Sequence, residues 1–190
     1  MASDTASTFH PRIYLAGPDI FYPDQDARYR RLEALCEAHG LHGVRPADEA
    51  DPPPGGAGGQ LLAEHIYAGN VRRLAQAEAV LANLEPFRNP VEPDSGTVFE
   101  VGMAIALGKP VVAYLPQAGQ TLAARVTAAF GERDAVGGLR YDAAYGLMIE
   151  DLGLPLNLML GCSVRAFAAT PEAAVKQLAS LLTEPPRRRG

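Results

Sequence analysis

The chain has 190 residues, of which 47% are apolar and 21% are charged, a composition typical of a globular protein with one sizeable core. Its formal net charge is −5, and its one basic run, residues 187–189, follows two prolines near the C-terminus. Nucleic-acid binding requires clustered Lys and Arg, so this charge argues against a nucleic-acid partner. No segment approaches the ~20 consecutive apolar residues that a membrane-spanning helix needs, which argues against a membrane partner.

The two ends of the chain are expected to lie outside the folded part. Residues 1–10 contain neither the basic region nor the apolar stretch of a signal peptide, and we interpret them as a flexible leader. Residues 185–190 are interpreted as a flexible basic tail, which leaves a single domain over 11–184. Cys36 and Cys162 lie among apolar residues and outside any Cys-x-x-Cys motif, so we expect two reduced, buried thiols in a cytoplasmic protein.

The N-terminal half alternates short apolar runs with longer periodic segments. The run RIYLAG (12–17) is rich in β-branched and aromatic residues and stops at Gly17-Pro18, which predicts a strand followed by a loop. The same reasoning predicts five further elements in chain order: helix 24–40, strand 42–46, loop 47–59, helix 60–77 and strand 78–84.

The C-terminal half is patterned less clearly. Its predicted elements are loop 85–93, helix 97–107, strand 110–115, and helices 121–130 and 170–184. The segment GLPLNLML (153–160) is apolar but contains a Pro and an Asn, so its form is left open. Strands that alternate with helices predict βαβ units and a parallel sheet covered on both faces. Ligands of such sheets bind beyond the carboxyl ends of the strands.

One acid, Glu100, interrupts an otherwise apolar run over 98–107. It could complete a capping box with Thr97 and serve only to start a helix. Alternatively, it is a carboxylate in apolar surroundings six residues after a second acid, Asp94, which is the setting in which pKa values are tuned for catalysis. Gly102 favours the second interpretation, because a helix formed only for stability rarely contains glycine. The two interpretations are compatible, since caps and binding sites both lie at helix starts.

The junction before this helix suggests the kind of ligand. Free amides at a helix start can cradle phosphate, but Asp94 would repel it, and a neutral ligand rich in hydroxyls fits better. Phe21 and Tyr22 follow the first strand and could join the core or stack on a base, of which stacking is favoured by their place at the carboxyl edge. No His/Cys/Asp cluster has metal-ligand spacing, so we expect neither metal nor cofactor.

Three motifs together resemble the nucleoside 2-deoxyribosyltransferase family: IYLAGP, DSGTVFEVGMAIALGKPVVAY and GLPLNLML, in the family's order between about residues 12 and 162. The resemblance implies an α/β, flavodoxin-like fold with a doubly wound five-stranded parallel sheet and helices on both faces. It implies transfer of 2-deoxyribose between nucleobases in nucleotide salvage, through a covalent deoxyribosyl-glutamate. The implied partners are deoxyribonucleosides, nucleobases and further copies of the chain in a homo-oligomer with shared active sites.

The resemblance also implies roles for single residues. Glu100 matches the nucleophile, Tyr14 the tyrosine that orients it, and Asp94 an acid that binds the deoxyribose hydroxyls. Asn157 and Met159 match residues that reach into the neighbouring subunit's site. The remaining expected substrate contacts are Gly17, Pro18, Phe21, Asn70, Ser95 and Gly96.

Asn70 departs from the family pattern, which has an Asp there that helps to move the proton of the base. An amide cannot act as an acid, so another group or a water would have to protonate the leaving base. Two alternatives stay open: an N-glycoside hydrolase of nucleosides, which shares the covalent intermediate, and a non-catalytic nucleoside-binding domain. A binding domain has no need of a buried nucleophile, so convergence of Tyr14, Asp94 and Glu100 on one pocket would favour an enzyme.

Overall fold

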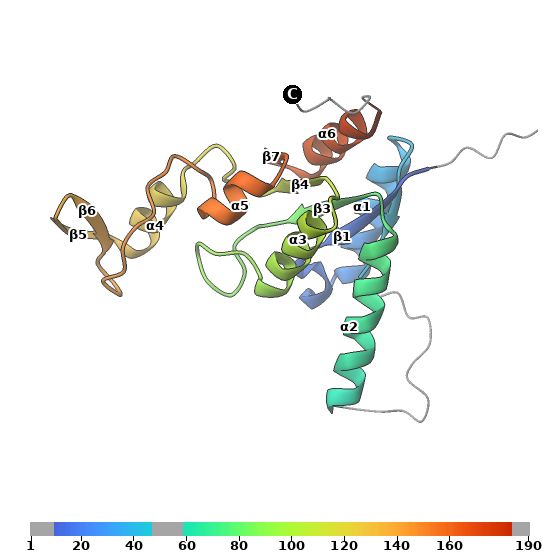
Figure 1. The fold of residues 1–190 in the computed structure, drawn as a ribbon, viewed down its shortest axis with the longest axis horizontal. Helices are drawn as coiled ribbons and strands as arrows, with labels where there is room; N and C mark the ends of the chain where they lie inside the picture. The colour runs from blue at the N-terminus through green and yellow to red at the C-terminus, as the bar shows by residue number, and fades with distance from the viewer. Residues whose placement is uncertain (1–9, 47–58, 184–190) are drawn as a thin grey trace, which may run out of the picture.

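A five-stranded parallel sheet in the order β2-β1-β3-β4-β7 forms the centre of the protein (Figure 1). The computed structural model describes residues 10–46 and 59–183, so the expected tail, residues 1–9 of the expected leader and nearly all of the predicted loop 47–59 lie outside the described residues. The strands of this sheet are β1 (Arg12–Ala16), β2 (His42–Val44), β3 (Ala79–Asn83), β4 (Val111–Tyr114) and β7 (Ala166–Ala168).

Each face of the sheet packs against its own pair of helices, because the central strands are apolar on both sides. Tyr14 and Val80 point to the face covered by α2 (Gly59–Gln76) and α3 (Ser95–Ala106). Ile13 and Leu81 point to the opposite face, covered by α1 (Gln25–Glu37) and α6 (Pro171–Thr183). The expected doubly wound α/β fold is confirmed, and it turns Tyr14 toward α3.

Several short elements were not predicted. The 3-10 helix η1 (Pro18–Phe21) occupies the expected loop after β1, and α5 (Leu158–Ser163) covers part of the segment 153–160. The fifth strand, β7, escaped prediction because three residues are too few to show a period. The hairpin of β5 (Glu132–Val136) and β6 (Leu139–Asp142) lies in a stretch without apolar alternation.

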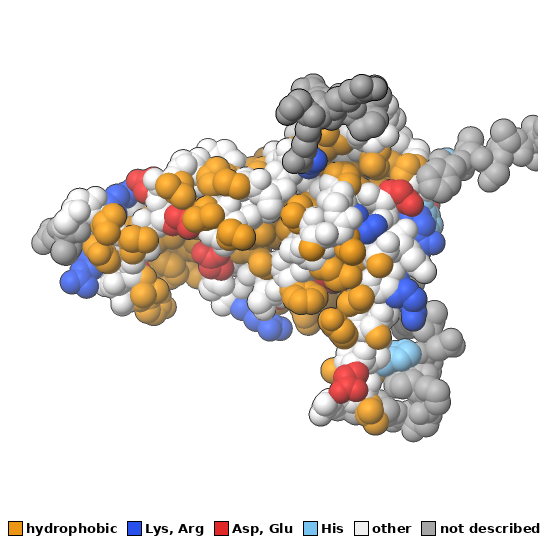
Figure 2. All heavy atoms as spheres, viewed as in Figure 1, with side chains coloured by type: hydrophobic (Ala, Val, Ile, Leu, Met, Phe, Trp, Pro, Cys, Tyr) orange, Lys and Arg blue, Asp and Glu red, His pale blue; other side chains and the backbone are white. Residues whose placement is uncertain are grey.

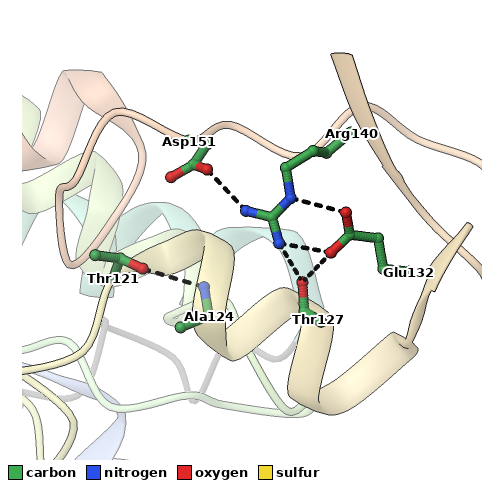
Figure 3. Close-up of polar contacts among 6 residues, drawn as sticks. All are labelled: Thr121, Ala124, Thr127, Glu132, Arg140 and Asp151. Carbon is green, nitrogen blue, oxygen red and sulfur yellow. Dashed lines mark hydrogen bonds and ion pairs between the residues drawn. The ribbon is translucent and has the colours of Figure 1, made fainter. Parts of the chain in front are cut away.

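Residues 121–157, which include α4 (Leu122–Phe130) and the β5–β6 hairpin, extend away from the sheet and are called the arm (Figure 1). The Arg140 guanidinium joins its parts: it lies 2.5 Å from Glu132 Oε2 and 2.7 Å from Asp151 Oδ2, and it also bonds Thr127 Oγ1 on α4 (Figure 3). These ion pairs are solvent-exposed, so each stabilises the fold by at most about 1 kcal/mol. Their geometry nevertheless links helix, hairpin and the returning chain.

The expectation of two buried thiols is wrong for Cys162. Cys36 is buried between α1 and the sheet, whereas Cys162 is exposed. The short helix α5 buries only Leu160, so Cys162 lies on its outer side. Among the described residues, no helix combines the length and the apolar character that crossing a bilayer would require.

Candidate active site

Glu100 lies in the second turn of α3, and the cap of this helix is not the one expected. Asp94 is the N-cap, and its Oδ2 accepts hydrogen bonds from Thr97 N at 2.9 Å and from Thr97 Oγ1 at 3.0 Å. The capping-box interpretation is therefore wrong, because Thr97 is inside the helix and Glu100 is beyond its first turn. A Cβ added at Gly102 would meet nothing within 4 Å, so packing gives no reason for that glycine.

The carboxylate of Glu100 is held by Tyr14. The Tyr14 hydroxyl donates a hydrogen bond of 2.5 Å to Glu100 Oε1, across the interface between β1 and α3. Tyr14 is 0% exposed, so its ring is fixed by the sheet and by the helices above it. No protein donor within the described ranges binds the second oxygen, Oε2, which leaves it available to a ligand.

A pocket of about 380 Å³ opens between α2 and α3, within the size range of small-molecule sites. Glu100, Asn70 and Gly96 line it, so the structure brings the expected nucleophile and the expected base contact into one cavity. The other lining residues are apolar or aromatic: Ala63, Ile66, Tyr67, Val71, Leu74, Phe99 and Met103. Such walls suit the faces of a flat heterocycle, and the rings of Tyr67 and Phe99 lie 6.3 Å apart there.

Burial dominates the electrostatics of Glu100. The pKa of Glu100 is raised from 4.5 to about 7: desolvation is the largest cause, the Tyr14 hydrogen bond opposes it, and the nearby Asp94 carboxylate adds to it. Burial and the Glu100 charge raise the pKa of Tyr14 as well, so its hydroxyl stays protonated and remains a donor. A carboxylate with a pKa near neutrality is poorly solvated and therefore reactive, as a nucleophile requires.

This arrangement predicts the pH dependence of activity. Glu100 must be ionised to attack, so kcat/KM should rise with pH to a plateau, with a midpoint of about 7. In Tyr14→Phe the midpoint should move to higher pH, because the bond that stabilises the charged form is gone. The plateau should fall about 10–100-fold, the value of a hydrogen bond to a charged group. A pH–rate profile of both proteins measures this, and identical midpoints would contradict it.

Asp94 lies at the mouth of the same helix. Its Oδ2 is occupied by Thr97, whereas Oδ1 has no protein partner in the part of the chain that the structure describes. A Cβ on Gly96 would lie 3.0 Å from Asp94 Oδ2, so a larger residue there would push this carboxylate away from its capping position. Ser95 is exposed in the first turn of α3. Tyr14, Asp94 and Glu100 therefore lie together near the start of α3, but of these three residues Glu100 alone lines the pocket.

The charge of Asp94 can be tested apart from its capping role. Asn caps helices as well as Asp, so Asp94→Asn should keep α3 intact while losing a charged acceptor. We expect kcat/KM to fall about 10–100-fold, less than on loss of Glu100. The acid midpoint should move to lower pH, because Asp94 raises the pKa of Glu100. Asp94→Ala, which also removes the cap, serves as the comparison in kinetics and thermal unfolding.

Polar side chains that sequence reasoning missed tie the carboxyl ends of β1 and β3 together. Buried Asp19 accepts a hydrogen bond from Asn83 Nδ2 at 3.0 Å and another from Arg28 at 3.2 Å. A Cβ on Gly17 would come within 2.7 Å of Asp19 Oδ2 and 2.8 Å of Asn83 Cβ, so only glycine fits there. Pro18 is buried in η1 and shapes this loop. The signal was available, because Asn83 is the polar residue that ends an apolar strand.

Phe21 is 56% exposed, so its core interpretation is wrong. Its ring stacks on Phe87 with centroids 5.4 Å apart, and the Arg88 guanidinium lies 5.0 Å from the Phe21 ring centroid. Phe21 follows β1 and Phe87 follows β3, so two loops at the carboxyl edge of the sheet meet here. Neither ring lines the pocket between α2 and α3. Stacking of Phe21 on a base stays a prediction.

Asn157 and Met159 do not line the pocket of their own chain. Asn157 is the N-cap of α5, where its Oδ1 accepts from Met159 N at 3.1 Å and from Leu160 N at 3.2 Å. Within the described residues, Asn157 Nδ2 makes no hydrogen bond, so it can donate one to a ligand. Met159 is 73% exposed. Across residues 10–46 and 59–183, no group of three or more His, Cys, Asp and Glu side chains could hold a metal ion.

Comparisons with known proteins agree with this geometry. The sequence profile of the family described as nucleoside 2-deoxyribosyltransferase matches residues 13–159. The solved structure of a 2-desoxiribosyltransferase from Leishmania mexicana is 31% identical and superposes with a TM-score of 0.68, covering 90% of this chain and 97% of that one.

Two curated relatives are more distant. The 5-hydroxymethyl-dUMP N-hydrolase of Mus musculus is 28% identical over 121 residues, which are 62% of this chain and 65% of the relative. An uncharacterised protein of Schizosaccharomyces pombe is 29% identical over 104 residues, which are 55% of this chain. The match spans about half of that relative, 49% of its length.

Proposed function

Because the chain belongs to the nucleoside 2-deoxyribosyltransferase family, we propose that it transfers 2-deoxyribose from one nucleobase to another through a covalent ester on Glu100. One observation carries the proposal: the Glu100 side chain lines a pocket of about 380 Å³, large enough for a nucleobase. The buried Tyr14 hydroxyl binds Glu100 Oε1 at 2.5 Å and leaves Oε2 for the substrate. A binding domain would have no use for a desolvated carboxylate oriented in this way. The 31% identity to the Leishmania mexicana enzyme supports the same assignment.

The first half-reaction makes the ester. Glu100 Oε2 attacks C1′ of the sugar from the face opposite the base, while Tyr14 keeps the carboxylate oriented. The bond from C1′ to the base nitrogen breaks, its electron pair leaves with the base, and the base takes up a proton. The transition state has oxocarbenium character, and the negative charges of Glu100 and Asp94 stabilise it.

The second half-reaction reverses the first with a new base. A ring nitrogen of the incoming base attacks C1′ from the face that the first base left, and that base releases a proton. The bond from C1′ to Glu100 breaks and its electrons return to the carboxylate. Two inversions give net retention at C1′. Oδ1 of Asp94 accepts hydrogen bonds from the sugar hydroxyls and keeps the deoxyribose in place between the two steps.

Asn70 contacts the base. It lines the pocket together with Glu100, and its amide can donate one hydrogen bond and accept another at the edge of a heterocycle. Because an amide does not ionise, the proton reaches the leaving base through a water bound at this edge, and this water regains a proton from the solvent. The aromatic pair Tyr67 and Phe99 contacts the flat face of the base.

Hydrolysis is the second candidate function. The relative from Mus musculus is a 5-hydroxymethyl-dUMP N-hydrolase, and in a hydrolase water attacks the same ester in place of the second base. For this chain we favour a substrate without a 5′-phosphate, since Asp94 and Glu100 give the site negative charge.

The proposed site is shared between two copies of the chain. Large apolar side chains are exposed on the arm and in the segment after it: Tyr145, Leu147, Met148, Leu152, Leu158 and Met159. A second exposed group lies on α2 and α3: Ile66, Tyr67 and Phe99, which line the pocket, and Leu61 in the first turn of α2. Figure 2 shows hydrophobic side chains gathered over both regions. Contact between the arm of one copy and the α2–α3 face of another would bury both groups and bring Asn157 to the partner's sugar site.

Incubation with deoxyinosine, with and without adenine, tests the function. The proposal predicts deoxyadenosine and hypoxanthine when adenine is present, and slow or no release of deoxyribose without it. Chromatography separates these products. Free deoxyribose formed at the same rate in both mixtures would identify a hydrolase, and an unchanged substrate in both would overturn the proposal.

A further inference from the structure

Arg125 of α4 is a buried cation with unusual partners. Its side chain is among the few charged groups of the core, with the residue only 6% exposed. Nη1 donates a hydrogen bond of 2.8 Å to the carbonyl oxygen of Val91, and Nη2 donates to the carbonyl oxygen of Pro155. Nε has no partner within the described residues. Desolvation lowers the pKa of Arg125, and the Glu92 carboxylate attracts this guanidinium without a direct ion pair in the described structure. A guanidinium buried mainly against neutral carbonyls loses its hydration, so stability alone gives little reason for it.

The two carbonyls belong to the two segments that carry the proposed sugar contacts. Val91 precedes the helix cap Asp94 by three residues, and Pro155 precedes Asn157 by two. The backbone adds one more link on the arm side, since Leu122 N donates to Leu154 O at 2.7 Å. Arg125 therefore bridges three segments: from α4, its two hydrogen bonds reach the loop before α3 and the segment before α5.

We propose that Arg125 is a positioning residue that holds the loop before Asp94 and the segment before Asn157 in one geometry. The position of α4 in the arm would then determine where both proposed sugar contacts, Asp94 and Asn157, lie. This inference rests on the proposed function. It follows from the shape of the guanidinium, whose planar fork can bond two carbonyls in fixed directions, whereas an ammonium is a single point of charge. If sites are shared between subunits, each Arg125 serves Asp94 of its own pocket and Asn157 of its partner's pocket.

The chain offers a matched control. Arg140 also lies in the arm, where it makes ion pairs with the surface residues Glu132 and Asp151 (Figure 3). None of these three residues lines the pocket. Arg140→Met removes an arginine from the same part of the fold without touching either carbonyl. Arg125→Met removes both bonds of the bridge, and Arg125→Lys keeps the charge without the fork.

The test measures kinetics and amide hydrogen exchange in the same four proteins, well below the unfolding temperature. We expect kcat/KM with deoxyinosine and adenine to fall about 10–100-fold in Arg125→Met and by less in Arg125→Lys, because small displacements of positioning groups are costly. Arg140→Met should stay within about twofold of the parent protein. Exchange should become faster in both segments, 91–97 and 155–160, while α6 is unchanged.

Each outcome decides the inference. Faster exchange in both segments together with the loss of kcat/KM supports it. Unchanged kcat/KM in Arg125→Met overturns it, even if the melting temperature falls, because Arg125 would then be structural only. Faster exchange in one segment alone also overturns it. If the parent protein catalyses neither transfer nor hydrolysis, the proposed function fails by that result, and the exchange data still decide whether Arg125 holds the two segments together.

Discussion

Replacing Glu100 by Ala or Gln is expected to abolish transfer, with a loss of about 10⁴-fold or more in kcat. The carboxylate is the only group in the described pocket that can form an ester with C1′, since the other lining side chains are apolar, aromatic or amide. Steady-state assays with deoxyinosine and adenine measure the loss. Turnover like that of the parent protein in either variant would end the proposal that Glu100 is the nucleophile.

The Gln variant carries its own folding control. The folded-state pKa of Glu100 is raised to about 7 from 4.5, so the folded state binds more protons than the unfolded state between these values. The protonated form therefore favours folding below pH 4.5, and this contribution is lost as pH rises through about 7. Glu100→Gln, which carries no charge, should be more stable than the parent protein at pH 8 by about 1–3 kcal/mol and not at pH 5. If Glu100→Gln is inactive and yet more stable than the parent protein at pH 8, its loss of activity comes from the missing carboxylate and not from misfolding.

Mixing two inactive variants is expected to restore activity if sites are shared. Glu100→Ala lacks the proposed nucleophile, and Asn157→Ala lacks the amide that is proposed to reach the partner's pocket. In a hybrid dimer one of the two sites carries both native residues. Since half of the dimers in an equal mixture are hybrids, about a quarter of the parent activity should return after subunit exchange. Neither variant alone should show it.

The cap of α5 complicates the Asn157 variant and suggests a better one. Asn157 Oδ1 caps α5 through Met159 N and Leu160 N, so Ala also weakens that helix. Ser caps equally well but is too short to reach a neighbouring pocket, so Asn157→Ser separates the two roles. Proven exchange of labelled subunits without recovery, or a fully active monomer in sedimentation, would show that Asn157 does not act across subunits.

The parts of the fold that sequence reasoning found are those with long or strongly patterned segments. Strands β1, β3 and β4 are continuous apolar runs because both of their faces are covered, and helices α1, α2 and α6 have regular spacing. In the arm, helix 121–130 was predicted and corresponds to α4, whereas the β5–β6 hairpin was not found. Arg140 links the hairpin through ion pairs with Glu132 and Asp151, and the hairpin sequence shows no apolar alternation that would predict strands.

Parts of the site escaped for a related reason. The sequence places Asp94 and Glu100 on one helix, but it does not tell which residue caps that helix, and Asp94 proved to be the cap. Asn83 could be singled out as the polar end of an apolar strand, but nothing local indicates that it meets Asp19, 64 positions away. In the sequence, Arg125 is indistinguishable from a residue on the exposed polar face of an amphipathic helix. Its contacts with the carbonyls of Val91 and Pro155 appear only in the folded structure.

Trapping the ester tests the central claim most directly. The protein is incubated with a deoxynucleoside that carries fluorine at C2′, since the electron-withdrawing fluorine destabilises the oxocarbenium-like transition state and slows breakdown of the ester. After acid quenching, intact-protein and peptide mass spectrometry locate the adduct. We expect one sugar per chain, on the peptide and side chain of Glu100, and its release when adenine is added to unquenched protein. Turnover of deoxyinosine with no adduct, or an adduct on another residue, would contradict the proposed mechanism.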